Sequence, residues 1–202
     1  MDTADGLAMP ELVSAAVAAG HLRDQRQPTL RADELTLRPW LLSDAPAVAA
    51  VYRDPEVQRW HVRSMDEAEA RDWVASWSRR WAAETGAGWA VTRDGELAAR
   101  VGFRLINLDE GLAEASYWTA PAARGCGIAV RALRAASGWM LTTGGLHRLE
   151  LNHSVANPAS CRVAVKAGYR YEGTKRQHTL HADGWHDMHV HGLLAEDLST
   201  TS

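Results

Sequence analysis

The hydrophobic and polar positions divide the chain into short strand-like segments and longer helix-like ones. Leu35–Pro39 alternates apolar and polar residues and stops at a proline, as a strand does. We predict the other strands over 88–93, 97–107, 114–119, 149–153, 169–179 and 186–194. We predict helices over 43–51, 67–84, 127–143 and 159–167, where capping residues or closing glycines mark their ends.

Turn residues indicate how several of these segments connect. Asp94-Gly95 and Asp183-Gly184 each separate two predicted strands, and an Asp-Gly pair is a strong hairpin signal. Other pairs of strands have a helix between them. Because the order mixes hairpins with strand–helix–strand units, we expect an α/β fold, α+β in some schemes. Its sheet should contain both parallel and antiparallel pairs.

The first thirty residues precede this pattern. Glu11–Leu22 has the alanine-rich composition of a short helix, and Gln25, Gln27 and Pro28 would end it before the domain begins. Chain termini often lack fixed structure unless they are tied down. We therefore divide the chain into an N-terminal extension, residues 1–30, and one domain, residues 31–202.

Composition narrows the class of protein. The chain has 202 residues and a formal net charge of −3, which suits one domain and favours neither nucleic-acid nor membrane binding. No apolar run approaches the roughly 20 residues that span a bilayer. The acidic start, Met1–Asp5, does not resemble a secretory signal, so we expect a cytoplasmic protein. Two cysteines, Cys126 and Cys161, are too few for a disulfide framework or a cysteine-rich zinc site.

Two groups of ring side chains could serve either structure or function. Trp73, Trp77 and Trp81 recur every four residues on one helix face, which fits core packing or an aromatic wall for a ligand. Several histidines gather near the C-terminus, and His189 and His191 would lie on one face of a strand. Since no cysteine or carboxylate set accompanies them in the sequence, we assign them structural or substrate-lining roles and predict no metal.

The chemistry is concentrated in the segment Tyr117–Val130, which leaves a strand and enters a helix through Gly125 and Gly127. Such a turn lets backbone N–H groups approach a phosphate, and the helix start adds a favourable dipole. Arg124 adds a positive charge. A nucleoside-triphosphate loop would need Gly-Lys-Ser/Thr, and a dinucleotide fingerprint would need glycine where Val130 stands, so neither is present.

Arg124-x-x-Gly127-x-Ala129 resembles the Arg/Gln-x-x-Gly-x-Gly/Ala pyrophosphate loop of the GNAT acetyltransferase superfamily, and more narrowly its RimJ/RimL-type branch. The stretches that resemble this branch follow in the right order: 35–44, 54–57, 145–150, 157–173 and 183–194. The resemblance implies a GNAT fold, with a mostly antiparallel twisted sheet of about six to seven strands, splayed central strands and flanking helices. It also implies acetyl-CoA as co-substrate and no metal.

The resemblance further implies a coenzyme site where strands 114–119 and 149–153 splay apart. Trp118 and Thr119 would lie along the pantetheine arm, and Asn157 would contact it. Ser160 would lie near the sulfur and could protonate the leaving thiolate. Backbone amides would hold the pyrophosphate at Arg124, Gly125, Cys126, Gly127, Ile128 and Ala129.

The same resemblance implies direct attack of an amine on the thioester. Glu114 would remove a proton from the amine, directly or through a water molecule, or would instead orient the substrate. Trp60, His61 and Trp77 would line the acceptor side. We therefore predict an N-acetyltransferase for an amine such as a peptide or protein N-terminus, acting as a monomer or homodimer. An acetyltransferase for a small-molecule amine, antibiotic or metabolite, is the alternative, and a non-catalytic CoA-binding regulatory protein is a further one.

Overall fold

The computed structural model describes residues 12–200 and contains one eight-stranded sheet in the order β1-β2-β3-β4-β5-β6-β8-β7. Within this range β5 and β6 form the one parallel pair, and all other neighbours are antiparallel. This confirms the expected mixed sheet, although with eight strands rather than six or seven. The strands are β1 (Leu30–Ala32), β2 (Leu35–Pro39), β3 (Gly86–Arg93), β4 (Glu96–Asn107), β5 (Leu112–Thr119), β6 (Arg148–Ser154), β7 (Arg170–His181) and β8 (Gly184–Leu194).

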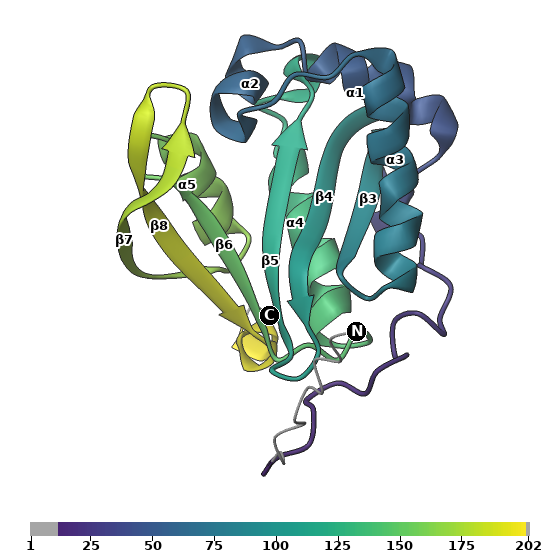
Figure 1. Ribbon diagram of the computed structural model, residues 1–202, viewed down its shortest axis with the longest axis vertical. Coiled ribbons are helices and arrows are strands. Elements are labelled where there is room, and N and C mark those ends of the chain that lie inside the picture. The colour runs from purple at the N-terminus through teal and green to yellow at the C-terminus, as the bar shows by residue number, and fades with distance from the viewer. Residues whose placement is uncertain (1–11, 201–202) are drawn as a thin grey trace, which may run out of the picture.

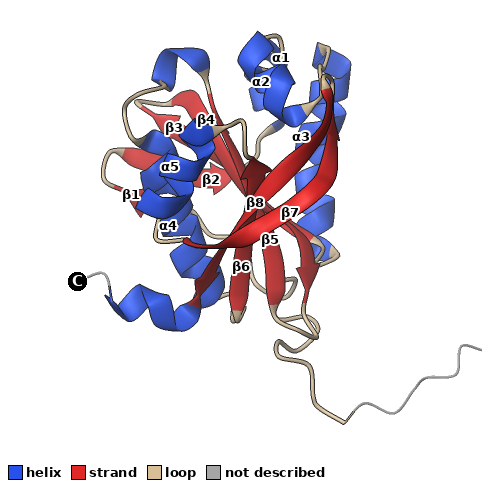
Figure 2. Cartoon of the chain, turned by 90° about the vertical axis from the view of Figure 1, so that its left-hand side faces the viewer, coloured by secondary structure: helices blue, strands red, loops and turns tan. Residues whose placement is uncertain are grey.

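Five α-helices cover the two faces of the sheet, with α1 to α3 on one side and α4 and α5 on the other (Figures 1 and 2). No helix of residues 12–200 is long and apolar enough to cross a membrane. The helices are α1 (Ala45–Val51), α2 (Pro55–His61), α3 (Glu67–Ala82), α4 (Ile128–Leu141) and α5 (Pro158–Lys166).

Local signals explain most of these boundaries. Asp94 and Gly95 both have positive φ, as the predicted tight hairpin between β3 and β4 requires. Asp66 caps α3 in a reciprocal capping box with Glu69. Helix α2 was not predicted, although Asp54 accepts a hydrogen bond from the Val57 amide and proline follows it at the first helical position.

The N-terminal segment differs from its prediction. Residues 12–22 form turns and bends instead of the expected short helix, and Glu11 lies outside the described residues. Val17 and Leu22 are nevertheless buried in the main core. The buried carboxylate of Glu84 accepts hydrogen bonds from the amides of Gly20, Leu22 and Arg23 at 2.6, 2.8 and 3.2 Å. These tertiary contacts outweigh the local helix propensity of the alanine-rich segment.

The sheet opens in the middle because β5 and β6 pair over only part of their length. Their register joins Leu112–Ala115 to Arg148–Leu151 and then stops. On its other side β5 stays paired with β4 as far as Thr119. The two strands therefore diverge beyond Ala115, as Figure 1 shows, and the β6-facing backbone edge of residues 116–119 has no strand partner.

Close packing of α3 on the sheet depends on two glycines. The indole of Trp77 lies so near β3 that a Cβ atom added at Gly88 would stand 2.4 Å from Trp77 Cε3. A Cβ atom added at Gly102 of β4 would stand 3.2 Å from Trp77 Cη2. Trp77 is itself 2% exposed. Because protein interiors are packed at crystal-like density, a rigid buried ring has little room to move away.

We predict that Gly88→Ala lowers the free energy of unfolding by about 1–3 kcal/mol, because the added methyl group overlaps the Trp77 ring. The matched control is Gly138→Ala in α4, where an added Cβ meets no atom within 4 Å. This control should raise the free energy of unfolding by about 0.5–1 kcal/mol, since alanine is the better helix former. Urea denaturation of the three proteins measures both effects, and equal stabilities would contradict the packing argument.

Candidate active site

A cleft of about 860 Å³ lies where β5 and β6 diverge. Its walls come from β5, the β5–α4 loop, the start of α5, helix α2 and the β7–β8 hairpin. Cys126 is the one predicted site residue that does not line it. The predicted residues that do are Trp60, His61, Trp77, Glu114, Trp118, Thr119, Arg124, Gly125, Gly127, Ile128, Ala129, Asn157 and Ser160.

The β5–α4 loop presents backbone groups in a geometry that suits an anion. Gly125 and Gly127 have φ values of +79° and +70°, and an added Cβ at either would meet no atom within 4 Å. Gly127 is the N-cap of α4 and supplies no side-chain cap. The first helical hydrogen bond runs from the Arg131 amide to the Gly127 carbonyl, so the amides of residues 128–130 precede the helical ladder. Unpaired N–H groups at the positive end of a helix suit a phosphate.

The side chain of Arg124 contributes less to this site than predicted. Its Nη2 atom lies 2.6 Å from Oδ1 of Asp54, the residue that caps α2. The hydrogen bond from Arg124 lowers the pKa of the Asp54 carboxyl. The guanidinium therefore links the loop to α2, and its charge is shared with a carboxylate.

Two of the predicted tryptophans are core residues. Trp118 is 2% exposed, and its ring packs against Trp40 and Tyr52 with centroids 6.3 Å away in each case. Because its side chain is buried, Trp118 can contribute to the cleft only through its backbone groups, which lie on the open edge of β5. Trp77 lies beneath the guanidinium groups of Arg80 and Arg100, at 5.0 and 4.8 Å from its ring centroid.

The start of α5 meets β5 through a pair of hydroxyl groups. The Tyr117 hydroxyl donates a hydrogen bond to Ser160 Oγ at 2.9 Å, and Asn157 Oδ1 accepts from the Ser160 amide at 3.0 Å. Burial raises the pKa of Tyr117 to about 12, so the phenol keeps its proton at neutral pH. Tyr117 was not predicted as a site residue. Strand alternation was the available signal, since it places Tyr117 on the face opposite Trp118.

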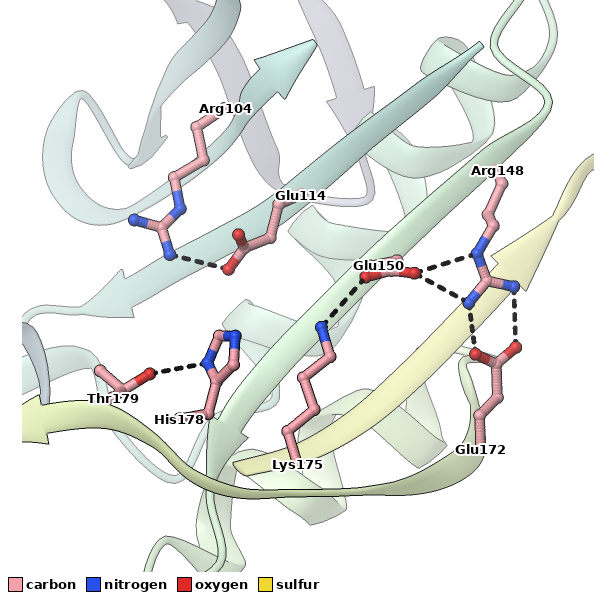
Figure 3. A network of polar contacts seen from close by, with 8 residues as sticks. All are labelled: Arg104, Glu114, Arg148, Glu150, Glu172, Lys175, His178 and Thr179. Carbon is pink, nitrogen blue, oxygen red and sulfur yellow. Dashed lines mark hydrogen bonds and ion pairs between the residues drawn. The ribbon is translucent and has the colours of Figure 1, made fainter. Parts of the chain in front are cut away.

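Glu114 reaches the cleft from the other face of β5 and is paired with Arg104, as Figure 3 shows. Arg104 Nη2 donates to Glu114 Oε1 at 2.7 Å, and the Glu114 side chain is 17% exposed. Its register partner on β6 is Glu150, which pairs with Arg148 and Lys175. Among the described residues, Glu114 and Glu56 are the carboxylates that line the cleft.

The half of the cleft lined by α2, α3 and β4, named the acceptor half after its predicted role, carries positive charge that was not predicted. Arg63, Arg80, Arg100 and Arg104 all line it. Arg100 is 6% exposed and donates to Ser116 Oγ at 3.1 Å. Burial lowers its pKa to about 10, which still leaves the guanidinium charged at neutral pH. An acceptor with a negative charge near its reacting amine would complement this half of the cleft.

His61 stands in the same half as a neutral imidazole. Burial, together with the positive charge of Arg100, lowers its pKa to about 4, although a backbone hydrogen bond with Tyr117 acts in the opposite direction. Trp60, its neighbour, is partly exposed and packs under Arg59 with the guanidinium 4.6 Å from the ring centroid. These two residues give the acceptor half a partly apolar wall.

Comparison with known proteins identifies relatives of the chain. The profile of the acetyltransferase (GNAT) domain family matches residues 34–170. The uncharacterized N-acetyltransferase YoaA from Bacillus subtilis (strain 168) is 26% identical over 83% of this chain and 97% of its own length. A ribosomal-protein-serine acetyltransferase from Escherichia coli (strain K12) is 27% identical over 52% of this chain and 59% of its own. The structure of RimL, a ribosomal L7/L12 alpha-N-protein acetyltransferase in complex with coenzyme A, superposes with a TM-score of 0.78 at 20% identity, covering 84% of this chain and 99% of RimL.

We predict an acid-dependent loss of stability that originates at His61. Its folded pKa of about 4 lies below the ordinary 6.5, so the unfolded chain binds more protons and stability falls as the pH drops below 6.5. Between pH 7.5 and pH 5 this group should cost about 2 kcal/mol of unfolding free energy.

His61→Gln should remove that part of the loss, as measured by urea denaturation at the two pH values. The exposed His147 provides the control, and His147→Gln should keep the wild-type pH dependence. Burial also lowers the pKa of His153 and His191, so a residual acid loss remains in every variant. Identical pH dependence in wild type and His61→Gln would contradict the prediction.

Proposed function

The chain belongs to the GNAT acetyltransferase family, and on that premise we propose that it transfers the acetyl group of acetyl-CoA to the amine of a peptide or protein N-terminus. Acyltransferase activity follows from the family. The observation that carries the proposal is the cleft between β5 and β6, which has a phosphate-binding loop at one end and an acceptor half at the other. Glu114, paired with Arg104, and the Tyr117–Ser160 pair line the same cleft.

The coenzyme half supports a bound acetyl-CoA. The pyrophosphate would accept hydrogen bonds from the amides of Gly127, Ile128 and Ala129. The pantetheine arm would run along the open edge of β5 at residues 116–119, where its amide groups replace the missing strand partner. Asn157 and Ser160 at the start of α5 would then stand near the thioester.

The catalytic groups suit direct transfer without a covalent enzyme intermediate. Glu114 takes a proton from the ammonium group of the acceptor, directly or through water, and the free amine attacks the thioester carbon. A backbone N–H of the open β5 edge stabilises the oxyanion. The C–N bond forms, the C–S bond breaks, and Ser160 gives its proton to the thiolate, while the second proton of the attacking nitrogen passes through water to Ser160 and restores its hydroxyl. Tyr117 donates a hydrogen bond to Ser160 Oγ, which orients the serine hydroxyl, and keeps its own proton.

The acceptor class is supported by two kinds of observation. The E. coli relative carries the name of a ribosomal-protein-serine acetyltransferase, and RimL that of an alpha-N-protein acetyltransferase. The arginines of the acceptor half favour a peptide with an acidic side chain close to its N-terminus. An anionic small-molecule amine would satisfy the same arginines, and it is the alternative.

A thiol-release assay with defined acceptors tests this function. We expect release of CoA with peptides that have a free N-terminus, faster for acidic than for basic peptides, and none when the same N-termini are formylated. Small amines should react more slowly than peptides. Turnover confined to small amines would contradict the proposed acceptor. Failure to bind acetyl-CoA in a calorimetric titration would contradict the function as a whole.

We predict that Glu114→Gln lowers kcat about 100-fold or more at pH 7, because the amide can still accept from Arg104 but cannot take a proton. The remaining rate should rise with pH as free amine becomes available. The matched control is Glu150→Gln, which removes the negative charge of the register partner on β6 and should leave kcat close to wild type. Thiol release by Glu114→Gln at the wild-type rate, at both neutral and alkaline pH, would show that Glu114 is not the base.

A further inference from the structure

Three histidines interrupt the apolar inner face of the sheet. On β6, Leu149 and Leu151 are buried in the main core, and the next position on that face is His153. On β8, His189 and His191 occupy the same face as Leu193, which is buried in the main core. The register pairs His153 with His189 directly across the two strands, so all three imidazoles share the face that α5 covers.

Helix α5 adds a thiol to this group. One donor atom from each of His153, Cys161, His189 and His191 can be chosen so that all four atoms lie within 4.8 Å of one another. The Nε2 atoms of His153 and His191 are 3.1 Å apart. His153 and His191 are buried, and the other two residues are partly buried. The prediction of no metal rested on the family resemblance and on the absence of a cysteine or carboxylate set beside the histidines in the sequence. The fold brings a cysteine, Cys161, to the histidines from a separate helix.

Within the cluster, two imidazole nitrogens have no hydrogen-bond partner among the described residues. His153 Nδ1 lies 2.8 Å from the Ser154 carbonyl oxygen and therefore carries the proton. The His153 Nε2 lone pair accepts a hydrogen bond from His191 Nε2 at 3.1 Å, a contact that a bound ion would replace. The Nδ1 atoms of His189 and His191 are buried and have no hydrogen-bond partner in the described part of the chain. Buried polar atoms without partners are uncommon in folded proteins, which indicates that the cluster is completed by something else.

We propose that His153, Cys161, His189 and His191 form a closed, four-coordinate Zn²⁺ site. Thiolate and imidazole are the ligands that zinc prefers, at about 2.3 Å for sulfur and 2.0–2.1 Å for nitrogen. Binding would replace the 3.1 Å hydrogen bond between the Nε2 atoms of His153 and His191 with two zinc–nitrogen bonds, and two imidazole nitrogens in such a tetrahedron stand about 3.3 Å apart. Binding takes up one Zn²⁺ and releases the Cys161 thiol proton, while all three imidazoles bind in their neutral form.

Such an ion would have a structural role with a consequence for the cleft. It would join β6, β8 and α5, and its ligand Cys161 directly follows Ser160 in the chain. The start of α5, which presents Asn157 and Ser160 to the cleft, would thereby be fixed to the sheet. With four protein ligands the ion has no open position, so it would not itself contact substrate.

Cobalt substitution tests the site on the full chain. After removal of metal by a chelator, addition of Co²⁺ should give one bound ion per chain, with intense visible bands of a tetrahedral ion and a near-ultraviolet thiolate-to-cobalt band. Zn²⁺ should displace Co²⁺ and raise the Tm by several degrees. A wild-type spectrum without the thiolate band overturns the proposal, and this measurement needs no variant.

Variants locate the bound ion. Cys161→Ser should abolish the thiolate band and weaken Zn²⁺ binding by more than ~100-fold, and His191→Asn should weaken binding similarly. The controls are Cys126→Ser, which changes the only other cysteine, and His147→Asn, which changes an exposed histidine. Both controls should bind as wild type does. Circular dichroism checks that each variant is folded, and a thiolate band that survives Cys161→Ser overturns the proposal.

Discussion

The separation of β5 from β6 beyond Ala115 is the constraint on which the rest of the site depends. Parallel pairing holds the two strands together over four register pairs and then ends. Beyond that point each strand is held by different neighbours. β5 stays paired with β4, where Trp118 packs against Trp40 and Tyr52, and β6 stays paired with β8. The gap between them is therefore a consequence of packing on opposite sides, and the cleft, the open strand edge and the approach of α5 all follow from it.

The two halves of the cleft use different physical means of recognition. At the loop, glycines with positive φ and the uncapped start of α4 offer backbone amides, and the side chain of Arg124 is paired with Asp54. In the acceptor half the recognition groups are side chains: arginines, an imidazole held neutral by burial, and the ion pair of Glu114 with Arg104. Backbone recognition suits a ligand common to a whole family, whereas side chains allow the acceptor to differ between members.

Much of the fold could be predicted because its signals are local. The Asp94-Gly95 turn, the capping of α3 and the strand over Leu35–Pro39 each depend on neighbouring residues, and all three are confirmed. The errors have tertiary causes. Residues 12–22 adopt turns instead of a helix because the amides of Gly20 and Leu22 donate hydrogen bonds to the Glu84 carboxylate. The three-residue β1 has too short a pattern to be recognised and forms because it pairs with β2.

The sequence by itself determined the character of the phosphate loop, since its glycines and the following helix are consecutive residues whose conformation is set locally. It also determined that His189 and His191 share a face, because strand periodicity is a property of the chain. Only the tertiary structure decided that Tyr117 meets Ser160, that Arg124 is paired with Asp54, and that Cys161 joins His153, His189 and His191. These groups come from elements far apart in sequence. Their distances depend on how α2, α5 and the diverging strands pack together, and no spacing along the chain encodes that packing directly.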